Sequence, residues 1–250
     1  MARMEFLSEN RLNTSTQLKV DSNTTTAAYL FDRNATLGYS SNGYSGATGT
    51  VISVEFTTPQ VLSHILLQEH NLKGFRVYYN SATANSLAIV SGNSSTSYYL
   101  AFSSVTVSSI QLQGDSVIAG SGEKNVGELI VGNRLSQFER NPSVKKFSPT
   151  IFRKQVEHEM PDGGAVLFNI KDKYRANLSW EFITSTFQSE LLGIFSDGDP
   201  LYFLPFPTTT LWDGAAYECA WVGDFNFRHA TNDKTQGYSG SILLKETPAR

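Results

Sequence analysis

The four histidines are the residues whose chemistry is most often catalytic, and they are widely separated along the chain: His64, His70, His158 and His229. None of them stands in a His-x-x-x-His or His-Glu-x-x-His pair, the spacing that binds zinc from one helix face. A Gly-x-Ser-x-Gly segment, which carries the serine nucleophile of many hydrolases, is absent from the sequence. These observations exclude a zinc or serine hydrolase of the common types.

The aspartates and the single cysteine give the remaining enzyme hypotheses. Asp197, Asp199 and Asp213 could act as a carboxylate pair for glycoside cleavage. The run at 196–200 reads Ser-Asp-Gly-Asp-Pro, however, and such runs are typical of turns. Cys219 lies in an alternating strand pattern, where a buried and inert thiol is expected. We therefore predict that the chain is not an enzyme.

Composition limits the class of partner. The chain has 250 residues and a net charge of −3, which does not suggest the basic face of a nucleic-acid-binding domain. One cysteine permits no internal disulfide, and no apolar run reaches the length of a signal peptide or a membrane span. We expect folding in a reducing cytoplasm, no nucleic-acid partner and no membrane insertion.

The elements that would position binding residues are β-strands. Residues 50–56 alternate between polar and apolar, which places Ile52, Val54 and Phe56 on one face. Short runs of the same kind recur after turn clusters, at 63–68, 74–79, 97–102, 107–112 and 127–131. Many short strands with little helical periodicity predict a mainly β fold that begins with a β-sandwich.

Proline and tryptophan divide the chain in two. Residues 1–135 contain Pro59 as their single proline and no tryptophan, whereas the remainder holds seven of the eight prolines and all three tryptophans. We predict one domain over 1–135, a linker over 136–148 and a second β-rich domain over 149–250.

The second domain combines strands with one helix. Residues 185–195 carry apolar side chains at helical spacing, after a Ser/Thr cap. Residues 176–182 alternate as a strand that is expected to bury Leu178, Trp180 and Phe182. Further strands are predicted at 200–207, 216–222 and 238–246, which gives a second β-sandwich-like domain with one short helix.

Four ordered segments of the first domain resemble the discoidin-type, galactose-binding-like jelly roll. They are the Phe-Asp-x-Asn-x-x segment at 27–36, the paired strands at 50–65, the strand at 72–80 and the Glu-Leu strand at 126–132. The resemblance covers roughly residues 20–133. It departs from the family where a tryptophan is usual, because Leu37-Gly38-Tyr39 stands there.

This resemblance implies two sites. A glycan would be bound by exposed aromatic and polar side chains at one end of the sandwich: Tyr39, Asn42, Tyr44, His70 and Arg76. A structural calcium would be held by hard oxygen ligands: Asp32, Asn34, Thr36 and Glu128. The alternatives are an ordinary loop around residues 39–46 and a turn held by hydrogen bonds of Asp32 and Asn34.

The second domain resembles the β-sandwich-plus-helix domains of tail-tip and minor tail proteins of tailed bacteriophages. The residues concerned are the Leu-x-Trp strand, the following helix, an aromatic strand ending in Phe-x-Pro and the final strand at 241–246. The resemblance implies assembly with other tail proteins and with copies of itself, as a ring-like homo-oligomer.

Together these features lead to one hypothesis and two alternatives. The hypothesis is a structural virion protein of a tailed bacteriophage, assembled in the host cytoplasm and placed in the tail, tail tip or baseplate, with an outward-facing jelly roll that could bind host glycans. The main alternative is a carbohydrate-binding lectin or adhesin module. An accessory protein of a glycosidase is a third reading and needs a catalytic partner.

Overall fold

A computed structural model of the chain describes residues 3–34, 37–41, 50–80, 85–119, 122–143, 147–160, 164–205, 216–232 and 237–247. The chain forms two compact units. The first comprises Met1–Leu135 with Leu204–Ala216 and Ala249–Arg250, and the second comprises Ser136–Phe203 with Tyr217–Pro248. The fold is mainly β, as predicted.

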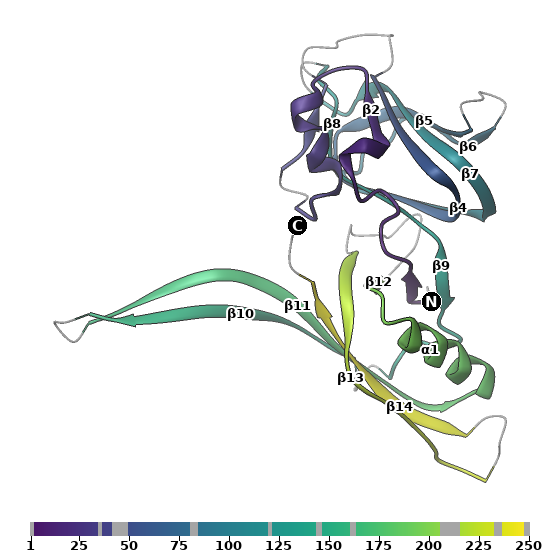
Figure 1. Cartoon of the computed structure of the whole chain (residues 1–250), viewed down its shortest axis with the longest axis vertical. Helices are drawn as coiled ribbons and strands as arrows, with labels where there is room; N and C mark the ends of the chain where they lie inside the picture. The colour runs from purple at the N-terminus through teal and green to yellow at the C-terminus, as the bar shows by residue number, and fades with distance from the viewer. Residues whose placement is uncertain are drawn as a thin grey trace. The chain divides into compact units, whose positions relative to one another are not determined.

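The first unit contains most of the short elements and the two longest strands of its sheet (Figure 1). In chain order they are β1 (Glu5–Leu7), η1 (Ser15–Gln17), β2 (Leu18–Val20), η2 (Thr24–Phe31), β3 (Tyr39–Ser40), β4 (Thr50–His70), β5 (Leu72–Tyr79), β6 (Ser86–Val90), β7 (Tyr98–Val117) and β8 (Asn125–Gly132). The strand β9 (Arg134–Gln137) follows and leads into the second unit.

The strands β2 to β8 form an antiparallel β-sandwich of the jelly-roll type. The first half of β4 pairs with β2 on one side and with the second half of β7 on the other, and β5 and β6 continue that layer. The second half of β4 pairs with the first half of β7 and with β8, and β3 completes that layer. The strands β4 and β7 therefore run through both layers and enclose one core between them.

The change of layer in β4 takes place around Pro59. The pairing of β4 with β7 is interrupted between Glu55 and Gln60, and Pro59 lies in this interruption, where its missing N–H costs no ladder hydrogen bond. Before it, Ile52, Val54 and Phe56 are buried in the core, which confirms the predicted face. The strands predicted at 63–68 and 97–102 are parts of β4 and β7 rather than separate elements.

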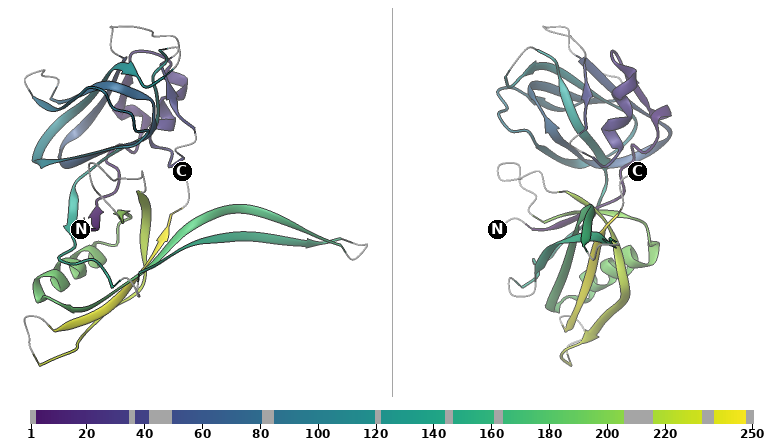
Figure 2. Two further views of the ribbon diagram at one scale, coloured as in Figure 1. Left: turned by 180° about the vertical axis from the view of Figure 1, so that it is seen from behind. Right: turned by 90° about the vertical axis from the view of Figure 1, so that its left-hand side faces the viewer.

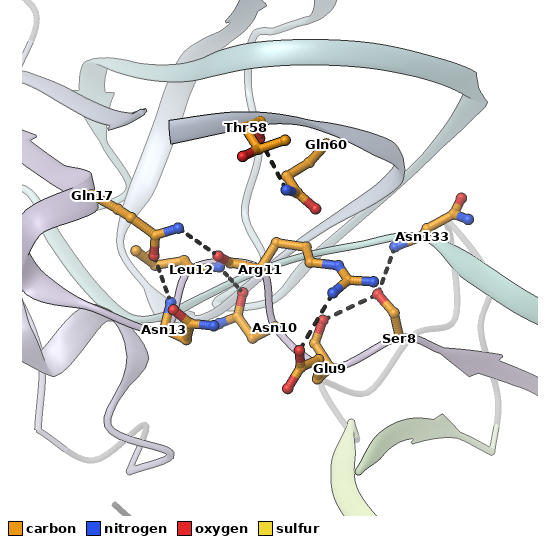
Figure 3. Close-up of polar contacts among 10 residues, drawn as sticks. All are labelled: Ser8, Glu9, Asn10, Arg11, Leu12, Asn13, Gln17, Thr58, Gln60 and Asn133. Carbon is orange, nitrogen blue, oxygen red and sulfur yellow. Dashed lines mark hydrogen bonds and ion pairs between the residues drawn. The ribbon is translucent and has the colours of Figure 1, made fainter. Parts of the chain in front are cut away.

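The side chain of Asn10 joins the segment before η1 to β8. Figure 3 shows Asn10 in this segment, where its side-chain oxygen also accepts from the Leu12 N–H. The amide of Asn10 donates to the Leu129 carbonyl at 2.9 Å and its oxygen accepts from the Val131 N–H, also at 2.9 Å. The Arg11 N–H donates to the Val131 carbonyl at 2.8 Å. These bonds attach this segment to the layer that contains β8, although its sequence has no strand periodicity.

In its described residues, the second unit is a curved antiparallel sheet with one helix. Its elements are β10 (Ser148–Glu159), β11 (Ala165–Ile183), α1 (Ser185–Asp197), β12 (Leu201–Leu204), β13 (Tyr217–His229) and β14 (Tyr238–Glu246). Five of its strands follow one another in the order β10-β11-β14-β13-β12. The helix α1 confirms the helix predicted at 185–195. Its N-cap is Thr184, whose side chain accepts a hydrogen bond from the Phe187 N–H at 3.1 Å.

Residues predicted as a linker contribute to this unit instead. Phe138 is fully buried, and its ring lies 5.2 Å from Trp180 and 5.7 Å from Phe187, centroid to centroid. Glu139 accepts hydrogen bonds from both the backbone N–H and the hydroxyl of Thr184. Residues 138 and 139 thus help to form the core and the helix cap, which the local polar composition does not reveal.

One predicted core residue is exposed. Leu178 and Trp180 are buried as expected, but Phe182 is 47% exposed. The register between β11 and β14 shifts between Trp180 and Ile183, and Phe182 adopts a φ of +58°. The irregularity interrupts the alternation, so that Ile183 takes the buried position that the pattern assigned to Phe182.

The hairpin of β10 and β11 extends beyond the other strands of this sheet (Figures 1 and 2). The strand β14 pairs with β11 over Arg175 to Ile183 only. Over the remainder, β11 pairs with β10 alone among the described residues. Residues 151–160 and 164–174 therefore form a two-stranded ribbon, which we call the arm.

Candidate functional site

Two of the predicted glycan-binding residues are core residues of the first unit. Tyr39 is fully buried at the start of β3, and its hydroxyl lies 3.1 Å from both the Ser22 hydroxyl and the Ser22 carbonyl. Burial raises the pKa of the Tyr39 hydroxyl. His70 is 1% exposed at the end of β4, and its ring meets Phe75 edge-on at 5.8 Å. In these positions neither ring offers a face to a sugar.

Arg76 is the predicted glycan-binding residue that the structure places at the surface. Asn42 and Tyr44 lie outside the described residues. Arg76 stands on β5, its side chain is 45% exposed, and its Nε lies 3.1 Å from Oδ2 of Asp115. An exposed guanidinium next to a carboxylate offers hydrogen-bond donors and acceptors side by side.

A β-bulge brings Asp115 to this position. Gly74 pairs with Ser116 and Phe75 with Gly114, so that Asp115 is the extra residue of β7 at the irregularity. A Cβ added to Gly74 would lie 2.7 Å from the Ser116 hydroxyl, so glycine permits the close approach of the two strands here. The bulge reorients the carboxylate of Asp115 toward Arg76.

Two further side chains complete this surface. Ile89 of β6 and Gln113 of β7 are the cross-strand neighbours of Arg76 on either side. Ile89 is 71% exposed. We call four residues the Arg76 face: the row Ile89, Arg76 and Gln113, together with Asp115. This face combines an apolar patch, a guanidinium, an amide and a carboxylate. Sequence reasoning identified Arg76 and missed the other three.

The predicted calcium ligands are partly described. Oδ1 of Asp32 accepts from the Asn34 N–H at 2.8 Å, which is the turn hydrogen bond given as the alternative. Glu128 is 4% exposed within β8, and Thr36 lies outside the described residues. No group of three His, Cys, Asp or Glu side chains suited to a metal occurs within the described part of the chain. A structural calcium held by Asp32, Asn34, Thr36 and Glu128 stays a prediction.

The residues considered for catalysis that the structure describes lie within β13 and at the end of α1. Cys219 is fully buried in β13, and burial raises the pKa of its thiol. Asp197 ends α1, Asp199 follows it and is exposed, and Asp213 lies outside the described residues. Among the helices that the structure describes, none has the length and apolar character needed to span a membrane.

A buried polar network in the first unit was not foreseen from the sequence. The Ser63 hydroxyl lies 2.7 Å from His64 Nδ1, and His64 Nε2 lies 3.1 Å from the Tyr99 hydroxyl. That hydroxyl donates to Oε2 of Glu5 at 2.9 Å. Although Ser, His and Glu are also the residue types of a hydrolase triad, Ser63, His64 and Glu5 are each 4% exposed or less. The network links β1, β4 and β7, and we assign it to stability.

The second unit has a polar hollow of about 380 Å³ on its sheet. It is lined by alternate residues of three neighbouring strands: Ser179, Glu181, Asn226, Arg228, Ser239 and Ser241, with Trp180 and Gly240. Arg228 Nε donates to Oδ1 of Asn226 at 2.9 Å. Trp180 is 1% exposed, so this hollow presents hydrogen-bonding groups without the exposed apolar contact that the Arg76 face has.

Comparisons with known proteins identify structural similarity only. No family model and no curated protein matches the chain. The chain is similar to the solved chitosan-binding module 1 from a Paenibacillus sp. IK-5 chitosanase/glucanase, at 14% identity and a TM-score of 0.39, over 46% of this chain and 92% of that one. It is also similar to the family 32 carbohydrate-binding module of C. perfringens NanJ in complex with galactose, at 14% identity and a TM-score of 0.41, over 52% of this chain and 99% of that one.

Proposed function

We propose that this protein is a non-catalytic glycan-binding protein and that the Arg76 face of its first unit is the binding surface. The observation that supports the proposal is the ion pair of Arg76 with Asp115, held by a β-bulge next to the exposed Ile89. Sugars present hydroxyl groups in fixed pairs together with apolar C–H faces. A surface that binds them needs planar donors, acceptors and an apolar contact within one row.

Each residue of the face has a separate role in this proposal. The Arg76 guanidinium donates to sugar hydroxyls, and Asp115 both orients it and accepts from a neighbouring hydroxyl. Gln113 adds one donor and one acceptor on the far side of Arg76. Ile89 contacts the apolar face of the sugar ring, and burying its exposed surface adds to affinity.

A glycan array with the full chain tests the proposal. The panel should include chitosan oligomers and galactosides, because the structurally similar modules include a chitosan-binding module and a galactose complex. The wild type is expected to retain at least one glycan, and Arg76→Ala is expected to weaken binding about tenfold or more, since a charge-assisted hydrogen bond contributes about 1.5–3 kcal/mol.

Three variants decide where the glycan binds. Lys73→Ala removes a second exposed cation from β5 and should leave binding unchanged. Arg228→Ala alters the polar hollow of the second unit, and Tyr44→Ala alters the aromatic residue that the sequence suggested. Retention of no glycan by the wild type refutes the function. Loss of binding in Arg228→Ala or Tyr44→Ala, with Arg76→Ala unaffected, refutes the site.

A structural role in a bacteriophage tail is a second candidate, favoured by the arm of the second unit, whose exposed apolar residues are typical of an assembly surface. In this proposal the chain occupies the tail, tail tip or baseplate of the virion and binds other tail proteins there. Mass spectrometry of purified particles tests it. Stoichiometric presence of the chain supports the role, and its absence from the particles refutes it.

A further inference from the structure

The arm exposes apolar side chains on both of its faces. According to the register of β10 with β11, Phe152, Val156 and Val166 share one face, and Ile151 and Leu167 lie on the other. Ile151 is 73% exposed, Leu167 59% and Phe152 57%. Exposed apolar side chains of this kind are typical of a segment that contacts another chain.

The arm also lacks the support that an isolated hairpin requires. Two antiparallel strands alone are marginally stable in water, and a third strand or a packed face is generally needed. No third strand pairs with residues 151–160 or 164–174 within the described part of the chain. Among the described strands, β10 is the outer one of its sheet, and its outer edge carries backbone N–H and C=O groups to which a further strand can pair.

The charges along β10 are arranged in a self-complementary way. Arg153 lies toward the base of the arm, where Asp172 of β11 is its cross-strand neighbour, whereas Glu157 lies toward the tip. Arg153 and Glu157 are both exposed, and they are four residues apart, so that they point to the same face of the strand. A second β10 laid antiparallel on the first, with Gln155 at the centre, would bring Arg153 of each copy opposite Glu157 of the other.

We propose that the arm pairs with the arm of a second copy of this chain, β10 against β10, about a two-fold axis at Gln155. In this register Arg153 of each copy lies opposite Glu157 of the other, and Gln155 lies opposite itself. Cross-strand pairs of opposite charge stabilise such a ladder. Pairing converts two ribbons of two strands into one sheet of four strands and closes the edge of each β10.

Charge reversal tests the contact in the full chain. Multi-angle light scattering after size exclusion should give the mass of two chains for the wild type. Arg153→Glu and Glu157→Arg should each weaken the dimer about tenfold or more, because each places two like-charge pairs in the contact. The double variant should restore the dimer, and Lys73→Glu, a reversal in the first unit, should leave it unchanged.

A cysteine at the axis tests the register. Opposed residues in an antiparallel pair have Cα atoms about 4.5–5.5 Å apart, a separation that a disulfide spans. Gln155→Cys should therefore form a covalent dimer under mild oxidation, whereas the wild type, whose one cysteine is buried, and Lys73→Cys should not.

Each outcome decides the proposal, and none depends on glycan binding. A wild type that is monomeric at every concentration refutes pairing between copies. A dimer that persists in both single charge variants, or that Gln155→Cys fails to cross-link, refutes this register. Loss of glycan retention in Arg76→Ala leaves the dimer intact and bears on the first unit alone.

Discussion

His70 should make the first unit sensitive to acid. The residue was expected to contact a glycan, but it is buried, and its Nδ1 accepts a hydrogen bond from the Leu72 N–H at 3.1 Å. Protonation at Nδ1 would break that bond and place a charge in the core. Burial accordingly lowers the pKa of His70 from 6.5 to about 4.

The size of the effect follows from this pKa. Above pH 6.5 His70 is neutral in both the folded and the unfolded chain. In that range it does not make the free energy of unfolding depend on pH. As the pH falls from 6.5 toward 4 the unfolded chain binds a proton that the folded chain does not, and stability is lost. The loss reaches about 3 kcal/mol below pH 4, which is a large fraction of the stability of an ordinary domain.

Hydrogen exchange in urea at pH 7, 5.5 and 4 measures this loss for each unit separately. Peptides from β7 report on the first unit and peptides from β11 on the second. In His70→Gln the side chain no longer titrates, so the variant should lose about 3 kcal/mol less than the wild type between pH 7 and 4, in the first unit alone. Equal losses in wild type and variant would falsify the assignment.

Three further outcomes are expected. Tyr99→Phe removes the hydroxyl between His64 and Glu5 and should lower the free energy of unfolding of the first unit by about 1–3 kcal/mol, measured by urea denaturation; an unchanged value would show that the network is not stabilising. Thr184→Ala removes the cap of α1 and should cost the second unit about 1 kcal/mol, with Ser189→Ala, an exposed helix position, as its control. The thiol of Cys219, buried and with a raised pKa, should react with a thiol reagent only after unfolding; rapid reaction of the native protein contradicts this.

Sequence patterns predicted the parts of the fold in which one face of an element meets one core. Ile52, Val54 and Phe56 are buried together, and α1 lies where helical spacing placed it. The pattern failed where the backbone is irregular, because a bulge reverses which residues face inward, as at Phe182. It also missed the arm, since a ribbon exposed on both faces has no periodic apolar signal.

The candidate site was predicted only in part for a related reason. The surface position of Arg76 could be predicted, because Arg76 stands between two apolar residues of a strand that face the core. The other three residues lie next to Arg76 only in the folded sheet. A bulge in β7 places Asp115 there, and strand pairing places Ile89 and Gln113 there. Tyr39 and His70 have residue types suited to sugar binding, but their burial depends on the packing of the whole sandwich.

Chemical-shift mapping with a retained glycan tests most directly where this protein binds sugar. Titration into the isotope-labelled full chain is expected to shift the amide signals of Ile89, Arg76, Gln113 and Asp115 in a saturable way and to leave those of Asn226 and Arg228 unchanged. Saturable shifts confined to the polar hollow of the second unit, or no shifts at all at the Arg76 face, would contradict the account.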